Sequence, residues 1–342
     1  MRPSRTPFVV DSLWWVLACA LLLLTGGFGL GCKGCEVQSP LSVDPALALL
    51  PAQTQTIVSI DLQQVRTSVL WNALSSATQG SAEDLKILGD LKVRTGFDPL
   101  VDLRRLVFAF PEDARVKGEF AMVAYGEHMD ERRLVSYARD EAKSRGFHIT
   151  QEEREGRRMW VGSDKLTARA GFFVDSQTFV LGGGGWAEKV AALVENPTQP
   201  SVARSAELSH LSARVGLGHA AWAAAVVPGA TRTRLGADPK FAAAANIARV
   251  AVSLDLKNGL VASARAELST KESATALTGE INNYIREAKQ SPKLLLMGVG
   301  PWLDGLVARS EGPLVQIELK LDAAQAQSMA DRLAALMKLA RK

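Results

Sequence analysis

The amino-acid sequence predicts an α+β protein with two similar modules, each an antiparallel-rich sheet with amphipathic helices packed on one face. Strand-like segments with alternating apolar residues recur between helix-like segments along the chain. Hairpin turns join several of these strands, most clearly at Asn258-Gly259. Amphipathic helices with capping residues follow the strands, as in 130–144. Strands joined by hairpins and alternating with helices are typical of α+β sheets covered on one face.

The first segment of the chain is predicted to be an export signal. Arg2 and Arg5 precede an apolar core at 13–24, which has the length of a signal-peptide core. The segment 29–32 (GLGC) resembles the lipobox of bacterial lipoproteins, in which small residues precede a lipidated cysteine. This resemblance implies that residues 1–31 are a signal peptide and that Cys32 becomes the lipidated N-terminus.

Two alternatives to a lipidated N-terminus remain open. Leu30 is larger than is usual before the cysteine, and Gly29 stands where lipoproteins prefer leucine. Residues 12–32 carry no charge, so the segment has the length of an uncleaved membrane anchor. Ordinary secretory cleavage is the third interpretation. For a lipoprotein, Lys33 in place of an aspartate implies the outer membrane, with the body facing the periplasm or the cell surface.

The three cysteines, Cys19, Cys32 and Cys35, all lie near the N-terminus. The body of the protein therefore has no disulfide framework, thiolate metal site or cysteine nucleophile. The Cys32-x-x-Cys35 spacing also occurs in redox and metal motifs, but here it coincides with the processing site and has no second pair.

Four regions follow from this organisation. After the signal, residues 32–47 form a lipidated N-terminus and a flexible tether rich in Gly, Ser and Pro. Residues 48–200 form the first α+β module and 201–342 the second, with the boundary at Asn196–Ser201.

In the first module, alternating or continuous apolar runs predict five strands, at 58–62, 106–110, 120–125, 172–174 and 179–181. Asp130 is the expected N-cap of a helix over 130–144. A second helix over 186–195 ends before Pro197, because proline cannot continue a helix.

The second module is predicted to contain the same kinds of strand and capped helix. Strands are expected at 250–256, 262–268 and 315–321. Ser269 and Glu272 predict a capping box at the start of the next helix, and Asp322 with Gln325 predicts the start of the last helix.

The element order suggests an internal duplication. The strand–cap–helix unit at 120–142 recurs at 261–288. Together with the N-terminal signal and the segment 50–54 (LPAQT) before the first strand, this order resembles a class of uncharacterised bacterial cell-envelope proteins, common in myxobacteria. The resemblance covers nearly the whole chain and implies an envelope location and duplicated α+β modules. It transfers no catalytic residue.

The charge distribution excludes a nucleic-acid binder. The 342 residues carry a net charge of only +4, and neither a basic stripe nor interleaved aromatic residues are present. The pairs Arg132-Arg133 and Arg157-Arg158 are interpreted as solvated faces. Contact with anionic lipid or a cell-wall polymer is the alternative.

No motif predicts a catalytic residue, a cofactor or a metal site. Gly182–Gly185 lacks the lysine and hydroxyl of a phosphate-binding loop, so it is interpreted as a strand-to-helix turn. The carboxylates of Glu152, Glu153 and Glu155 are expected in an exposed hairpin. The histidines have no metal-ligand spacing, and the tryptophans of the body are scattered rather than clustered; these residues are His128, His148, His210 and His219, and Trp71, Trp160, Trp186, Trp222 and Trp302.

These observations together favour a noncatalytic, lipid-anchored protein of the cell envelope with a binding or scaffold role. Its expected partners are the membrane, through the lipid anchor, and an envelope protein or a cell-wall component; nucleic acid is not expected. The alternative function is an envelope hydrolase whose site is assembled from residues distant in the sequence.

Overall fold

The structure is a computed structural model that describes residues 44–71, 82–112, 118–163, 168–205, 208, 211, 215, 218–292, 294, 300–303 and 306–340. The predicted signal peptide, Cys32 and most of the tether lie outside the described residues. His210 also lies outside them.

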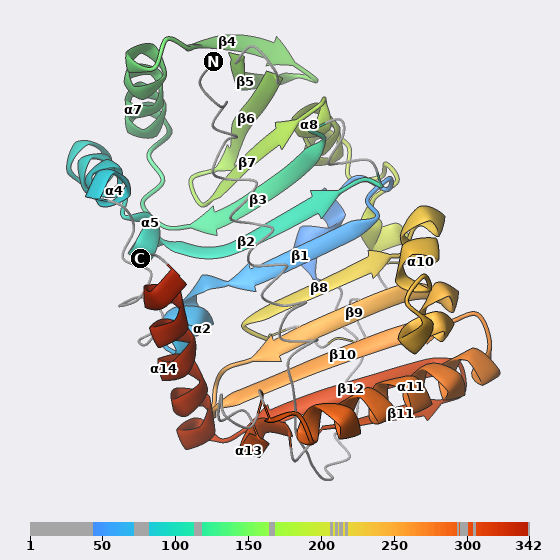
Figure 1. The fold of residues 1–342 in the computed structure, drawn as a ribbon. Coiled ribbons are helices and arrows are strands. Elements are labelled where there is room, and N and C mark those ends of the chain that lie inside the picture. Colours follow the sequence, from blue (N-terminus) through green and yellow to red (C-terminus); the bar gives the residue numbers. More distant parts are fainter. Residues whose placement is uncertain are drawn as a thin grey trace, which may run out of the picture.

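One twisted antiparallel sheet of 12 strands runs through the whole molecule (Figure 1). The strands of the first half are β1 (Thr56–Asp61), β2 (Leu103–Phe110), β3 (Phe120–Gly126), β4 (His148–Arg154), β5 (Arg157–Ser163), β6 (Ala168–Asp175) and β7 (Thr178–Gly183). Those of the second half are β8 (Ala221–Val226), β9 (Ile247–Asp255), β10 (Leu260–Leu268), β11 (Val307–Glu311) and β12 (Leu314–Leu321).

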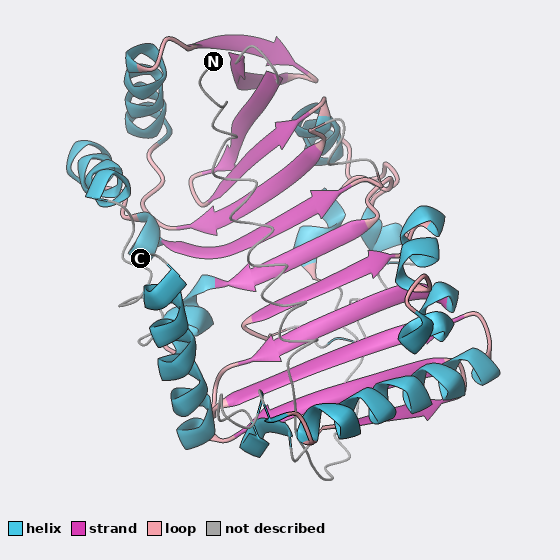
Figure 2. Ribbon diagram, in the orientation of Figure 1, coloured by secondary structure: helices cyan, strands magenta, loops and turns pink. Residues whose placement is uncertain are grey.

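Helices lie around the rim of the sheet and against its faces (Figure 2). The α-helices among the described residues are α2 (Leu62–Arg66), α4 (Ala82–Thr95), α5 (Pro99–Asp102), α7 (Glu131–Ser144), α8 (Trp186–Glu195), α10 (Gly229–Leu235), α11 (Lys271–Lys289), α13 (Gly300–Leu303) and α14 (Ala323–Ala340). Three 3-10 helices accompany them, η1 (Pro45–Leu49), η2 (Val202–Arg204) and η3 (Pro239–Asn246).

The strand order is β11-β12-β10-β9-β8-β1-β2-β3-β7-β6-β5-β4. This arrangement confirms the predicted α+β class with an antiparallel sheet. The two predicted modules share the sheet, because β1 pairs directly with β8. In each half, a three-stranded meander is followed by a long helix, α7 or α11, and then by strands that return beside the meander's third strand. The order of elements is thus similar in the two halves, and the duplication stays a prediction.

Local signals placed several elements correctly. Asp130 caps α7, because its carboxylate accepts from the Arg133 amide at 3.1 Å. Helix α8 spans the predicted residues 186–195. At the start of α14, Asp322 and Gln325 accept reciprocally from each other's backbone amides at 2.8 and 3.1 Å, as a capping box requires.

The capping box predicted at Ser269 and Glu272 is wrong by one residue. Thr270 is the N-cap of α11 and accepts from the Ser273 amide at 3.1 Å. Ser269 is still held by the preceding segment, since its backbone amide donates to the Asn246 carbonyl at 3.1 Å. That contact keeps Ser269 out of the capping position.

The largest core lies on the face of the sheet covered by α8, η1 and η2. Trp186 and Val190 of α8 pack there against Phe172 of β6, and all three are almost completely buried. Leu47 of η1 and Val202 of η2 belong to the same core. The core also includes the β8 and β9 side chains of Trp222, Ala224 and Ala251. The predicted modules therefore share a core as well as a sheet.

The folded body begins earlier than predicted. Asp44 and Leu47, assigned to the flexible tether at 32–47, are 3% and 1% exposed. They are ordered because η1 packs against the sheet.

In the second half, helices α11 and α14 cover the opposite face of the sheet. Leu319 and Leu321 of β12 pack with Met329 of α14, and Val315 packs with Leu277 of α11. Alternate residues of a strand point to opposite faces. Gln316 and Glu318 therefore lie on the other face of the sheet, which is the face that α8 covers in the first half.

Candidate functional site

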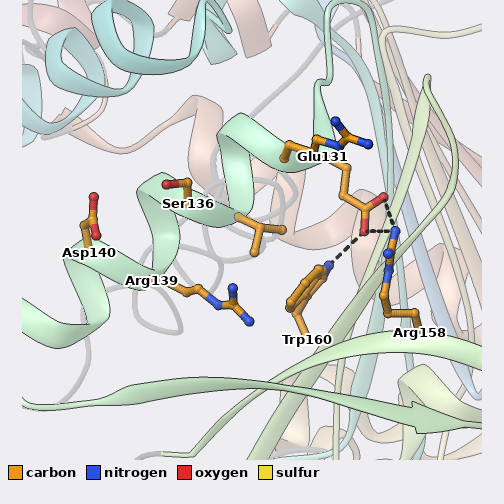
Figure 3. A pocket seen from close by; sticks show the side chains of 8 residues that line it. Glu131, Ser136, Arg139, Asp140, Arg158 and Trp160 are labelled. Atoms are coloured by element: carbon orange, nitrogen blue, oxygen red, sulfur yellow. Dashed lines mark hydrogen bonds and ion pairs between the residues drawn. The ribbon is translucent and has the colours of Figure 1, made fainter.

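A pocket of about 360 Å³ opens between α7 and β5 near one end of the sheet (Figure 3). Its lining is mostly charged and polar, with a small apolar part formed by Val135 and Trp160. The lining residues are Glu131, Arg132, Val135, Ser136, Arg139 and Asp140 of α7, and Arg158 and Trp160 of β5.

The periodicities of helix and strand bring these side chains together. Residues four apart on a helix lie on the same face, so Glu131, Val135 and Arg139 form one row along α7, and the residues that follow each of them form the adjacent row. On β5, Arg158 and Trp160 share a face because they are two residues apart. The β5 neighbours of Trp160 point into the core under α8.

Glu131 ties the helix to the strand. Its carboxylate accepts from the indole Nε1 of Trp160 at 3.1 Å and from a guanidinium nitrogen of Arg158 at 3.1 and 3.2 Å. Because three groups are linked, the Trp160 ring has a fixed orientation at the pocket wall. Figure 3 shows these contacts as dashed lines.

Two guanidinium groups also contact the aromatic ring. The guanidinium carbon of Arg139 lies 4.6 Å from the centroid of the Trp160 ring, and that of Arg158 lies 5.8 Å away. Both distances are within the range of cation–π attraction. The ring therefore helps to hold two positive charges at the pocket.

The pocket has more positive than negative charge available to a ligand. Glu131 pairs with Arg158, and Asp140 pairs with Arg94 of α4. Among the residues that the structure describes, no carboxylate lies within ion-pair distance of Arg132 or Arg139, and both side chains are exposed. Arginine guanidinium groups at such positions present hydrogen-bond donors in a planar fork that suits carboxylates and phosphates.

Helix α4 fixes the position of α7 from the other side. The Tyr137 hydroxyl donates to the Ile87 carbonyl at 3.2 Å, and the Arg94 guanidinium lies 5.0 Å from the Tyr137 ring centroid. Burial raises the pKa of Tyr137, with the Glu141 carboxylate as the next cause. Tyr137 thus stays a neutral hydrogen-bond donor at neutral pH.

The sequence patterns pointed to single residues of this pocket but did not predict that they form one pocket. It interpreted Arg132 and Arg158 as solvated faces and Trp160 as a scattered packing residue. The available signal was a basic pair at the start of the predicted helix 130–144 and another just after the acidic residues of the predicted hairpin. Their meeting depends on the packing of α7 beside β5, which no local pattern specifies.

A second polar cluster lies in the core near the middle of the sheet. The Arg105 guanidinium on β2 makes a two-armed ion pair with Asp44, one contact being 3.0 Å, and donates to the Ser59 hydroxyl of β1 at 2.9 Å. Asp44 also caps η1 by accepting from the Ala46 amide at 3.0 Å. The cluster joins the first folded residues to the sheet.

Tyr125 of β3 lies beside this cluster. Burial raises the pKa of Tyr125 to about 12; nearby Arg105 opposes this shift, and the Asp44 carboxylate adds to it. The hydroxyl is consequently neutral over the physiological range.

This raised pKa predicts a loss of stability at alkaline pH. Below pH 10 the Tyr125 hydroxyl is protonated in both the folded and the unfolded chain. Between about pH 10 and 12 it ionises only in the unfolded chain, which lowers the free energy of unfolding by about 2 kcal/mol. Urea unfolding of the wild type and of Tyr125→Phe at pH 9 and pH 11.5 measures this effect. The free energy of unfolding of the wild type should fall further between the two pH values than that of the variant, which has no hydroxyl to ionise. A constant difference between the two proteins would contradict it.

Two of the described histidines lie near a carboxylate, and a third is exposed. His128 Nδ1 lies 3.1 Å from a carboxylate oxygen of Asp102, and His219 Nδ1 lies 3.8 Å from one of Asp255. The sequence spacing did not reveal these pairs, because they form between segments far apart in the chain. His148 is exposed at the start of the edge strand β4. Among the described residues, no hydroxyl or thiol is hydrogen-bonded to His128.

The other expected features are placed as follows. Glu152, Glu153 and Glu155 lie exposed in the hairpin of β4 and β5, as predicted. Gly182 and Gly183 end β7, and Gly184 and Gly185, both at positive φ, form the predicted turn into α8. Within the described part of the chain, no group of three or more His, Cys, Asp or Glu side chains is arranged to hold a metal. None of the described helices has the length and apolarity needed to cross a bilayer.

Comparisons with known proteins give a structural likeness only. No protein-family model and no curated protein matches the chain. The chain is similar to crystal form I of the treponemal protein TP0453, with a TM-score of 0.48 and 14% identity over 86% of this chain and 98% of that one. Crystal form III of TP0453 gives a TM-score of 0.47 and 15% identity, over 86% of this chain and 99% of that one.

Proposed function

We propose that this chain is a noncatalytic, lipid-anchored protein of the cell envelope that binds an envelope component in the pocket between α7 and β5. The lipid anchor is Cys32, and the expected location is the outer membrane. The observation that supports a binding role is the pair of exposed arginines, Arg132 and Arg139, beside the fixed ring of Trp160. Other charges of the pocket are neutralised by their neighbours, whereas these two point to a ligand that brings negative charge.

The arrangement of the pocket also supports a binding role. Its two carboxylates, Glu131 and Asp140, are each held in an ion pair with an arginine. Contact with a guanidinium holds each carboxylate in a fixed position, where it serves as a hydrogen-bond acceptor for a bound molecule.

The anchor gives the first test. Replacing Cys32 with serine removes the thiol that receives lipid, so we expect the protein to lose its lipid label and processing at this site to stop. Metabolic labelling with an alkyne fatty acid and N-terminal analysis of the mature protein measure both effects. Cys35→Ser is the matched control and should be processed normally. An unchanged mature N-terminus in the Cys32→Ser protein would refute the anchor.

The binding role gives the second test. Full-length wild-type protein and Arg139→Gln, each immobilised in detergent, are exposed to a total envelope extract. We expect the wild type to retain a component that contains sugar or phosphorus, and the variant to retain at least tenfold less, because one of the two unneutralised guanidinium groups is lost. Arg145→Gln is the matched control, since Arg145 is the C-cap residue of the same helix and already pairs with Glu141. Equal retention by all three proteins would contradict the proposed site.

A further inference from the structure

We infer that the pocket between α7 and β5 binds an acidic sugar, a sugar ring that carries a carboxylate or a phosphate. This inference rests on the proposed binding function and names its ligand class. It follows from the spacing of the positive charges, from the hydrogen-bonding groups between them and from the aromatic wall.

The spacing of the charges indicates a ligand larger than a single inorganic anion. Arg132 and Arg139 are seven residues apart on α7, which places their backbones about 10 Å apart along the helix axis. Both line the same pocket. A lone phosphate occupies only one of these positions, whereas a ligand of sugar size extends from one guanidinium toward the other. The volume of about 360 Å³ lies in the range of small-molecule pockets.

The groups between the arginines suit hydroxyls. The Ser136 side chain is exposed at the pocket and makes no hydrogen bond within the described structure, so its hydroxyl is available both to donate and to accept. The Glu131 carboxylate has acceptor capacity beyond its contacts with Arg158 and Trp160, because two carboxylate oxygens offer about four lone-pair sites. Sugar hydroxyls require this mixture of donors and acceptors.

The apolar part of the pocket is small and partly aromatic. It consists of Val135, which is 9% exposed, and the half-buried ring of Trp160. Such a surface matches the C–H face of one sugar ring and is too small for an acyl chain. The indole is held in place by Glu131, so the Trp160 ring itself does not have to be ordered on binding. A sugar ring there packs beside the Arg139 guanidinium, which lies 4.6 Å from the centroid of the Trp160 ring.

The carboxylates of the pocket disfavour a polyanion. Glu131 and Asp140 lie among the arginines, and a chain of closely spaced phosphates would meet like charge at both. A sugar with one acidic group places its anion against Arg139 or Arg132 and its hydroxyls against the carboxylates.

Calorimetric titration of the full-length protein in detergent tests the assignment with four defined probes. These probes are glucuronic acid, glucose 1-phosphate, uncharged glucose and inorganic phosphate. We expect both acidic sugars to bind at least tenfold more tightly than glucose or phosphate alone. The comparison of the two acidic sugars shows whether the acidic group is a carboxylate or a phosphate.

Three variants connect binding to the pocket. Arg139→Gln should weaken acidic-sugar binding at least tenfold, and Trp160→Leu should weaken it for both acidic sugars by removing the ring. Arg145→Gln should bind as the wild type does. Unchanged thermal unfolding of each variant shows that the fold is intact.

Several results would overturn the inference. Equal binding of glucose and glucuronic acid would remove the role of the arginines, and equally tight binding of inorganic phosphate would leave an anion site without sugar recognition. If no probe binds while envelope material is still retained in an Arg139-dependent way, the acidic-sugar assignment fails and the proposed function stands. If no probe binds and no Arg139-dependent retention is observed, the acidic-sugar assignment and the proposed function both fail.

Discussion

Replacing Gly182 with alanine is expected to lower the free energy of unfolding by about 3 kcal/mol, the upper part of the range for overpacked sites. Gly182 lies in β7 where the first turn of α8 crosses the strand. A Cβ atom there would lie 2.4 Å from the Ala187 amide nitrogen and 3.0 Å from the Trp186 carbonyl carbon. These are backbone atoms of a helix whose first two residues are buried, so the contact is relieved only by moving α8 out of the core.

The matched control for this substitution is Gly279→Ala in the interior of α11. Apart from the neighbouring backbone of α11 itself, no described atom lies within 4 Å of the Cβ that this change adds. Alanine favours a helix over glycine by up to about 1 kcal/mol, so the control should raise stability slightly. Chemical denaturation of both variants gives the comparison. A Gly182→Ala protein as stable as the wild type would show that α8 does not approach β7 as closely as described.

Replacing Asp44 with alanine is expected to cost about 3 kcal/mol. The carboxylate is 3% exposed and is the ion-pair partner of Arg105, whose guanidinium is left without its counter-charge in a half-buried position. Removing one partner of a buried pair is strongly destabilising for this reason. The change also removes the cap of η1.

Asp98→Ala is the control that separates the buried ion pair of Asp44 from its role as a helix cap. Asp98 also caps a short helix that begins with proline, and it accepts from the Leu100 amide at 3.0 Å. Its ion pair is with Lys92, whose side chain is 62% exposed. We expect a loss of only about 1 kcal/mol, the usual value of a cap and an exposed pair. Equal losses for the two variants would mean that the Asp44–Arg105 pair adds nothing beyond capping.

Elements with strong local signals were predictable, and those set by burial were not. The turn at Asn258-Gly259 and the cap at Asp130 placed β9, β10 and α7 correctly because turn and cap chemistry act within a few residues. Ser59 shows the limit. It alternates with apolar neighbours and so indicates a solvent-facing position, yet it is 2% exposed. Strand β1 lies in the middle of the sheet, and its polar side chain is satisfied by Arg105 from β2.

The candidate site was beyond sequence reasoning for a related physical reason. Arg139 and Trp160 are 21 residues apart and belong to a helix and a strand whose relative position depends on tertiary packing. Tyr137 is one of the contacts that hold α7 in place, and it reaches back to α4. No periodicity within a single element contains that information. The sequence identified the basic pairs and the aromatic residue, and only the fold brings them to one pocket.

The place where Asp44 joins the sheet has a consequence for how strongly the pocket needs to bind. If Cys32 carries lipid, 11 residues separate the anchor from Asp44, and covalent geometry limits their span to about 40 Å. The pocket then explores a thin shell next to the membrane instead of the whole compartment. A ligand fixed in the same shell is concentrated there relative to the rest of the compartment. Under these conditions, a weaker intrinsic affinity is enough to keep the pocket occupied than would be needed for a protein free in the whole compartment.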